Sequence, residues 1–138
     1  MISCDNQTTV PYPEALLEAI AVHLSESEIE LILTDDVGIR AVNLAHRAKD
    51  SATDVLSFPL VAMEGFPLGS IMISVDRAQN VALSLGHTIE DELALLFIHG
   101  MLHLLGYDHE VDDGAMRQKE KEVVAHFNLP NSLIVRND

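Results

Sequence analysis

The stretch Thr88–Gly106, with the sequence TIEDELALLFIHGMLHLLG, decides how this chain folds. It opens with Thr88-Ile89-Glu90-Asp91, a capping-box pattern typical of a helix N-terminus, and it closes on Gly106, which can turn the chain. Between these two signals, apolar residues occupy nearly every side of the predicted helix. A helix that is apolar all round is buried, because no face of it suits water. We therefore expect this stretch to be the central helix of the protein.

Shorter elements surround this helix in the sequence. Alternating aliphatic residues predict strands, and apolar residues spaced by three or four predict amphipathic helices. The strands are expected at Met1–Cys4, Glu28–Thr34, Asp54–Leu60 and Leu68–Val75. The helices are expected at Ala15–Leu24, from an N-terminus at Thr34-Asp35-Asp36 toward Arg47, at Asp76–Gly86 and at Asp112–His126. Strands and helices do not alternate strictly, which favours an α+β fold. We expect a small mixed β-sheet packed with helices around the apolar helix.

Length and composition favour one intracellular domain. The chain has 138 residues, is 48% hydrophobic and shows no repeat or linker, so we expect a single domain over residues 1–138. Its one cysteine, Cys4, cannot form an internal disulfide, which suggests a reducing compartment. No signal peptide is visible, and the longest apolar run, Leu93–Ile98, is far shorter than the ~20 residues of a membrane span. We expect a cytoplasmic protein without a membrane partner.

The charge balance is strongly acidic. Asp and Glu number 22 against 8 Lys and Arg, a formal net charge of −14. A nucleic-acid-binding protein usually carries a basic surface, so this composition argues against a large nonspecific RNA or DNA surface. The composition is still compatible with a small cationic cleft, because Arg40, Arg47 and Lys49 lie within ten positions of one another. We expect the fold to gather these three residues near the functional site, and the acidic remainder to dock basic proteins.

Three of the seven histidines form a metal-binding pattern: His99, His103 and His109. Positions i and i+4 share one face of a helix, so the first two imidazoles can converge on one ion. A turn at Gly106 can then return His109 as a third ligand. Three nitrogen ligands leave the fourth tetrahedral position open, which is typical of catalytic zinc. We expect one Zn²⁺ per chain. The histidines without this spacing are expected not to bind metal: His23, His46, His87 and His126.

One position of this pattern decides the chemistry. The spacing H-x3-H-x2-G-x2-H is similar to that of metzincin peptidases, which have a glutamate base directly after the first histidine. Here Gly100 stands at that position, so peptide hydrolysis by that route is disfavoured. A metal that acts as a Lewis acid, together with an arginine that stabilises phosphate oxygens, suits a phosphodiester. Arg47 is the best candidate for that arginine.

Two stretches resemble the YbeY endoribonuclease family. The first is residues 99–109, HGMLHLLGYDH, and the second is residues 43–50, NLAHRAKD, followed by TDVLSFP at residues 53–59. The resemblance implies an α+β fold, a three-histidine zinc site and hydrolysis of single-stranded RNA. It further implies rRNA maturation, including the 3′ end of small-subunit rRNA, and ribosome quality control, with rRNA and ribosomal particles as partners and no DNA.

The same resemblance suggests roles for two further residues. Arg47 matches the functionally important arginine of the family, so we expect it to be catalytic. Ser57 lies in the family's loop beside the site, and we expect it to bind substrate. The chain departs from the family at Ser70, where an aspartate is common. The resemblance therefore does not tell which contact this position makes near the site or at the end of its strand.

Other interpretations remain at this point. One is a metal-dependent hydrolase of another substrate, including a peptidase whose base comes from elsewhere. Another is a ribosome-assembly factor whose metal is mainly structural and whose acidic surface docks basic ribosomal proteins. The general base is also open: Asp108 is a candidate, although its carboxylate could instead cap the turn before His109.

Overall fold

A mixed four-stranded sheet lies at the middle of the computed structural model, which describes residues 2–59, 68–108 and 110–130. The strands are β1 (Ile2–Asn6), β2 (Ile29–Thr34), β3 (Val55–Pro59) and β4 (Gly69–Ser74). Their spatial order is β1-β2-β4-β3, with β1, β2 and β4 parallel and β3 antiparallel to β4. The described helices are α1 (Glu14–Leu24), α2 (Asp36–Arg47), α3 (Val75–Leu85), α4 (Ile89–Leu104) and α5 (Ala115–His126). The predicted α+β class with a small mixed sheet is confirmed.

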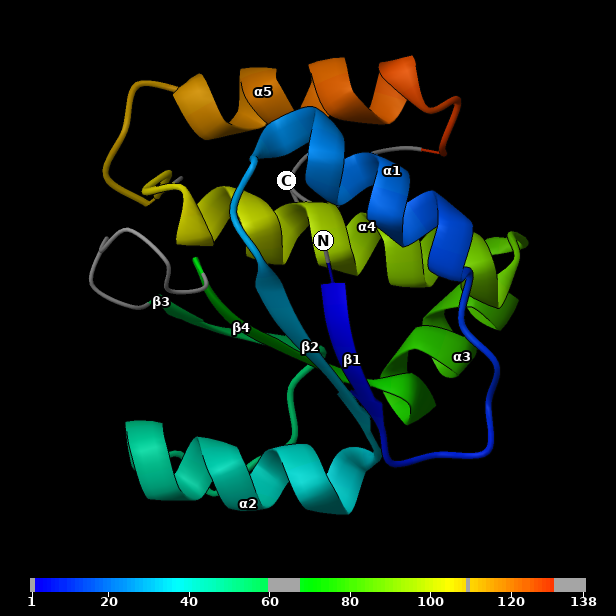
Figure 1. The fold of residues 1–138 in the computed structure, drawn as a ribbon. Coiled ribbons are helices and arrows are strands. Elements are labelled where there is room, and N and C mark those ends of the chain that lie inside the picture. The colour runs from blue at the N-terminus through cyan, green and yellow to red at the C-terminus, as the bar shows by residue number, and fades with distance from the viewer. Residues whose placement is uncertain (1, 60–67, 109, 131–138) are drawn as a thin grey trace.

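The helices cover the two faces of the sheet unequally. Helix α2 packs on one face, while α4 packs on the other with α1 and α5 beyond it (Figure 1). On the α2 side, Ile39, Leu56 and Met72 form a small apolar cluster. The larger core lies on the α4 side and takes side chains from every described strand and helix except α2. This unequal cover leaves α4 between the sheet and a second layer of helices.

Helix α4 is buried over most of its surface. It contacts β3, β4, α1, α3 and α5, and side chains such as Leu93, Leu96 and Phe97 are fully excluded from solvent. Each such side chain contributes about 1.5–3 kcal/mol to folding relative to an exposed one. Two histidines, His99 and His103, lie near the C-terminal end of the helix, beyond its acidic first turn and apolar middle, and keep partial exposure. The packing of α4 therefore determines where these imidazoles point.

Both ends of α4 follow the local signals in the sequence. The Thr88 hydroxyl accepts a hydrogen bond from the Asp91 amide at 3.1 Å. At the other end, Gly106 adopts φ 98°, and the amides of Gly106 and Tyr107 donate to the carbonyls of His103 and Leu102, both at 3.0 Å. This Schellman arrangement needs a residue that adopts a positive φ without strain, which explains the glycine at position 106. The chain after α4 is thereby turned back beside His103.

The prediction for α5 began too early. The sequence predicted a helix from Asp112, but α5 starts at Ala115 because Gly114 adopts a left-handed conformation with φ 95°. The Asp112 carboxylate instead accepts hydrogen bonds from the amides of Gly114 and Met116, at 2.8 and 3.1 Å. An aspartate that accepts hydrogen bonds from the unpaired amides at the start of a helix is easily assigned to the helix itself when only the sequence is known. Two other predicted ends, Met1 and Leu60, lie outside the described residues.

Within the described ranges, none of the helices has the length and apolar character needed to cross a membrane.

Close packing of α4 on the sheet depends on Gly100. A Cβ atom added there would lie 2.9 Å from Ile71 Cγ2 on β4 and 3.2 Å from Ser57 Oγ on β3. Ile71 is fully buried, so it has no open space into which to move. The Ser57 hydroxyl donates to the Gly100 carbonyl at 3.2 Å and ties β3 to the helix backbone. Glycine at position 100 therefore lets the helix and the strand meet directly beside His99.

We predict that Gly100→Ala destabilises the protein by about 1–3 kcal/mol, because overpacking at Ile71 outweighs the better helix propensity of alanine. Urea unfolding measures the change. Gly86→Ala is the control for a purely conformational effect, since Gly86 has φ 76° and no atom within 4 Å of an added Cβ. A gain in stability for Gly100→Ala would contradict this account of the helix–sheet contact.

Candidate functional site

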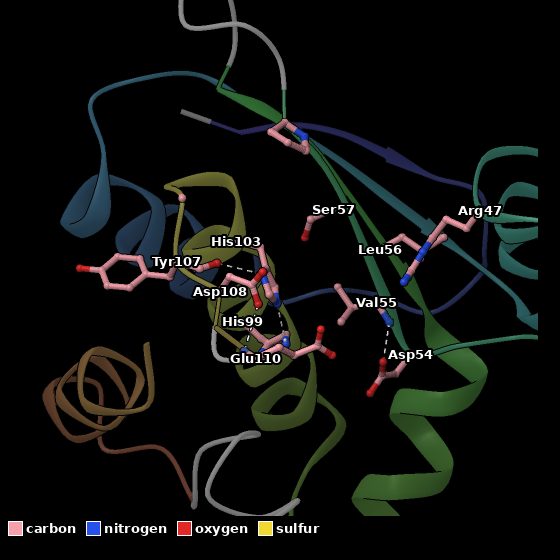
Figure 2. A pocket seen from close by; sticks show the side chains of 12 residues that line it. Arg47, Asp54, Val55, Leu56, Ser57, His99, His103, Tyr107, Asp108 and Glu110 are labelled. Atoms are coloured by element: carbon pink, nitrogen blue, oxygen red, sulfur yellow. Dashed lines mark hydrogen bonds between the residues drawn. The ribbon is translucent and has the colours of Figure 1, made fainter. Parts of the chain in front are cut away.

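A pocket of about 540 Å³ opens where the ends of α2 and α4 face strand β3. Its wall includes an arginine, a histidine pair, a serine and carboxylates. The described residues that line it are Arg47, Asp54, Val55, Leu56, Ser57, Pro59, His99, His103, Gly106, Tyr107, Asp108 and Glu110. Figure 2 shows Arg47 across the pocket from the two histidines. Four of the five residues predicted as a site, Arg47, Ser57, His99 and His103, are thus brought together.

The two histidines of α4 converge through their Nε2 atoms. These atoms lie 3.2 Å apart, and the ring planes meet at 78° (Figure 2). Both Nδ1 atoms point to other partners: that of His103 lies 3.1 Å from the Tyr107 carbonyl oxygen, and that of His99 lies 3.0 Å from Glu120 Oε2. The carbonyl can only accept a hydrogen bond, so Nδ1 of His103 carries the proton. The Schellman turn at Gly106 therefore fixes the tautomer of a candidate ligand.

This arrangement fits a divalent metal ion. With protons on both Nδ1 atoms, the two Nε2 atoms present lone pairs toward one another, and these repel unless a cation or a shared proton lies between them. Imidazole nitrogens aimed at a common point are the donors that zinc takes in open catalytic sites. Among the residues that the structure describes, no three His, Cys, Asp or Glu side chains gather as a metal site. His109 lies outside those residues, so its place as third ligand stays a prediction.

Arg47 reaches the pocket because α2 ends there. It is the last residue of the helix, and Ala48 follows in the left-handed conformation with φ 55°. Beside this helix end, the His46 ring lies 5.4 Å from the Phe58 ring on β3, and the Arg47 side chain lines the pocket. Arg47 is exposed, which leaves its guanidinium open to a ligand.

The expected gathering of three basic residues is wrong. Arg40 pairs with Asp50 at 2.7 Å and lines a different, smaller depression of about 300 Å³ beside Val37. The hydrogen bond and the charge of Arg40 hold the pKa of the Asp50 carboxyl below its ordinary value. Lys49 is not among the described residues that line the main pocket. A short sequence distance did not bring these cations together, because α2 presents Arg40 and Arg47 at different ends.

The pocket is therefore not cationic by its side chains alone. Asp54, Asp108 and Glu110 line it together with a single arginine. The Asp108 carboxylate accepts a hydrogen bond from the Glu110 amide at 3.0 Å, so it caps the turn and also faces the pocket. Asp54 accepts a hydrogen bond from the Val55 amide at 2.8 Å. A bound divalent cation would balance this excess of negative charge.

Ser57 and Ser70 have different surroundings. Ser57 lines the pocket, but its hydroxyl already donates to the Gly100 carbonyl, so only its oxygen lone pairs remain for a ligand. Ser70 is not among the residues that line the pocket, and its hydroxyl donates to Glu30 Oε1 at 3.0 Å on the neighbouring strand. An aspartate at position 70 would face Glu30 directly across the sheet, which is unfavourable for like charges. Serine at position 70 avoids this repulsion and donates a hydrogen bond to Glu30 on β2 instead.

Sequence reasoning missed three acidic residues: Asp54, Glu110 and Glu120. Asp54 lies within the quoted stretch TDVLSFP, where only Ser57 was assigned a role, and Glu110 directly follows the stretch that ends at His109. Glu120 had a detectable signal, since it shares the inner face of α5 with the buried residues Met116, Val123 and Val124. A carboxylate on an otherwise apolar helix face needs a buried partner. The four histidines predicted not to bind metal do not line the pocket.

Comparison with known proteins now identifies the family. A family model described as Endoribonuclease YbeY matches residues 5–128. The chain belongs to the YbeY endoribonuclease family. The match covers nearly the whole chain and starts before the two stretches on which the resemblance was first based.

Named relatives and a solved structure agree with this membership. A protein of Nautilia profundicola named Endoribonuclease YbeY is 56% identical over 138 residues, which is all of this chain and 99% of the relative. A protein of Helicobacter pylori with the same name is 56% identical over 99% of this chain and 98% of its own. The solution structure of a protein from Thermotoga maritima matches with a TM-score of 0.64 and 31% identity, and covers 92% of this chain and 89% of that one. The YbeY family thus accounts for the chain from end to end.

Proposed function

We propose that this protein is a zinc-dependent endoribonuclease that cleaves single-stranded RNA. The observation that carries the proposal is the convergence of His99 and His103 Nε2, at 3.2 Å, in a pocket that also presents Arg47. Membership in a family whose relatives are named endoribonucleases supports the same reaction class. The proposed substrates are ribosomal RNAs, including the 3′ end of small-subunit rRNA, and the proposed roles are rRNA maturation and ribosome quality control.

His99, His103 and His109 would hold the metal. When bound, Zn²⁺ supplies a Lewis acid that favours developing negative charge on oxygen and makes water a better nucleophile near neutral pH. The two described histidines contribute by pre-aligning their Nε2 atoms, which their Nδ1 partners keep in place. The open shape of the pocket leaves room for a nucleotide backbone beside the imidazoles.

Arg47 would bind the scissile phosphate. Its planar guanidinium offers donors in a fork that matches two phosphate oxygens, and it stays charged at any physiological pH. It lies opposite the histidine pair, so a phosphate between them would be held from two sides (Figure 2). The Ser57 oxygen can accept a hydrogen bond from a substrate hydroxyl at the same wall.

A carboxylate of the pocket would accept the proton of the attacking hydroxyl or water. Asp54, Asp108 and Glu110 all line the pocket and can act as general bases. Gly100 cannot, and its close contact with Ile71 leaves no space for the glutamate of metzincin peptidases. RNA hydrolysis is therefore favoured over peptide hydrolysis at this site.

We predict that His103→Ala abolishes stoichiometric zinc binding and RNA cleavage, because one of three ligands is lost. Metal analysis of tag-free protein and cleavage of a labelled single-stranded RNA, with and without a chelator, measure both. His126→Ala is the matched control, since His126 stacks on His23 away from the pocket and should leave zinc content unchanged. Full zinc binding by His103→Ala would place the metal elsewhere.

We predict that Arg47→Ala lowers RNA cleavage by about 100-fold, a typical loss for one charge-stabilising donor, while zinc content stays at the wild-type value. Arg47→Lys should also be impaired, because it keeps the charge but loses the fork. The control is Arg40→Ala, which removes an exposed pair outside the pocket and should leave cleavage within about twofold. Wild-type cleavage by Arg47→Ala would exclude Arg47 from the mechanism.

The net charge of −14 supports ribosomal particles as the proposed partner. Free RNA is repelled by an acidic body whose pocket holds several carboxylates, whereas basic ribosomal proteins are attracted to it. Docking on such proteins would bring the pocket to rRNA that free diffusion delivers slowly. A ribosome-assembly role and the nuclease reaction are compatible on this surface.

We predict that charge reversal far from the pocket slows cleavage of RNA in ribosomal particles more than cleavage of naked RNA. Asp5→Lys with Glu14→Lys is suitable, because both residues are exposed and neither lines the pocket. The difference should shrink as salt rises, since the screening length falls to about 8 Å at physiological ionic strength. Equal effects on both substrates would refute docking through acidic charge and leave the zinc chemistry standing.

A further inference from the structure

We infer that Glu120 on α5 is a positioning residue that orients His99 for the metal. The inference rests on the proposed function, since it assigns a role toward the proposed zinc. Glu120 is 1% exposed, and its Oε2 lies 3.0 Å from His99 Nδ1. It belongs to a different helix from the histidines and does not line the pocket. Its action on a bound metal must therefore pass through the imidazole.

The position of Glu120 argues for a role beyond packing. The other buried residues of α5 are apolar: Met116, Val123 and Val124. Burying a carboxylate among them costs several kcal/mol unless it is paired, and an apolar residue of similar size is often as stable. The helix thus carries a carboxylate that is tolerated because it is paired with the imidazole of His99. Packing of α5 on α4 alone does not require that group.

The chemistry of the contact explains what the carboxylate does. A carboxylate on Nδ1 holds the proton at that nitrogen, so the lone pair stays on Nε2, which points toward His103. The negative charge also increases the donor strength of Nε2. The Nδ1 of His103 faces the neutral Tyr107 carbonyl instead of a carboxylate. The two histidines are therefore unequal, and His99 is expected to be the stronger ligand.

The chain contains a matched pair for comparison. His87 Nε2 lies 2.8 Å from Oε1 of Glu92, and Glu92 is also 1% exposed. This pair lies at the N-terminal end of α4, whereas His99 lies near the C-terminal end. Neither residue lines the pocket. Losing the carboxylate there has the same type of structural cost as losing it at Glu120, without a metal ligand involved.

The experiment compares Glu120→Gln with Glu92→Gln in the full-length protein. Zinc affinity is measured by competition with a chromophoric chelator, and stability of the metal-free protein by urea unfolding. We expect Glu120→Gln to weaken zinc binding by about 10–100-fold, the usual effect of losing such a partner, and Glu92→Gln to bind as the wild type does. Glu120→Asp, which restores the charge, should recover part of the affinity. Wild-type affinity in Glu120→Gln, or equal losses in both variants, would overturn the inference.

A second measurement does not depend on affinity. The ring nitrogens of His99 in the metal-free protein, observed by long-range ¹H–¹⁵N NMR, should show the proton on Nδ1 in the wild type and a mixture of tautomers in Glu120→Gln. An unchanged tautomer would overturn the inference even if zinc binding fell. Failure of the proposed nuclease reaction is separate: a wild-type protein that binds zinc but leaves RNA intact refutes the reaction, and the variants still decide the role of Glu120. A wild-type protein that binds no zinc overturns both.

Discussion

The contact between Gly100 and the sheet is the constraint on which the rest of the site depends. Helix α4 is apolar on nearly all sides, so it folds only with the sheet on one side and other helices beyond it. At Gly100 the helix backbone comes close enough for Ser57 to bond its carbonyl, and no Cβ atom fits between them without a shift of Ile71. The residue before it, His99, is therefore held at the sheet edge beside β3. A site made of residues far apart in sequence follows from this one approach.

Polar groups in this core are kept at a low cost by fixed partners. The imidazoles of His99 and His103 have their Nδ1 atoms near acceptors from α5 and from the turn after α4. The buried carboxylates Glu92 and Glu120 each lie within 3.0 Å of a histidine ring nitrogen. Unpaired groups of this kind would cost about 1–3 kcal/mol each, and more if charged. With their Nδ1 atoms engaged, the two imidazoles direct their Nε2 atoms at the pocket, which is where metal binding is proposed.

The electrostatics of the pocket differ from a simple RNA-binding surface. One arginine faces the histidines, and several carboxylates share the wall. Without a bound cation such a pocket repels phosphate, and with one it combines a local positive centre with groups that can accept protons. The dense negative charge of the remaining surface then acts over longer distances than the pocket does. This balance of a local positive centre and a formal net charge of −14 underlies the proposal that the substrate is presented by another molecule.

Local signals in the sequence determined much of this protein. The apolar pattern of α4, its threonine cap, the turn at Gly106 and the i, i+4 spacing of His99 and His103 depend only on neighbours along the chain, and the alternation of β4 likewise located a strand within a residue. The tertiary structure alone decided which distant residues meet. It placed Arg47 opposite the histidines, paired Arg40 with Asp50 away from them, and brought Glu120 from α5 to His99. The reason is physical: spacing within a helix follows from its fixed 3.6-residue turn, whereas contact between elements depends on how their faces pack, and the pattern of one element does not record the position of another.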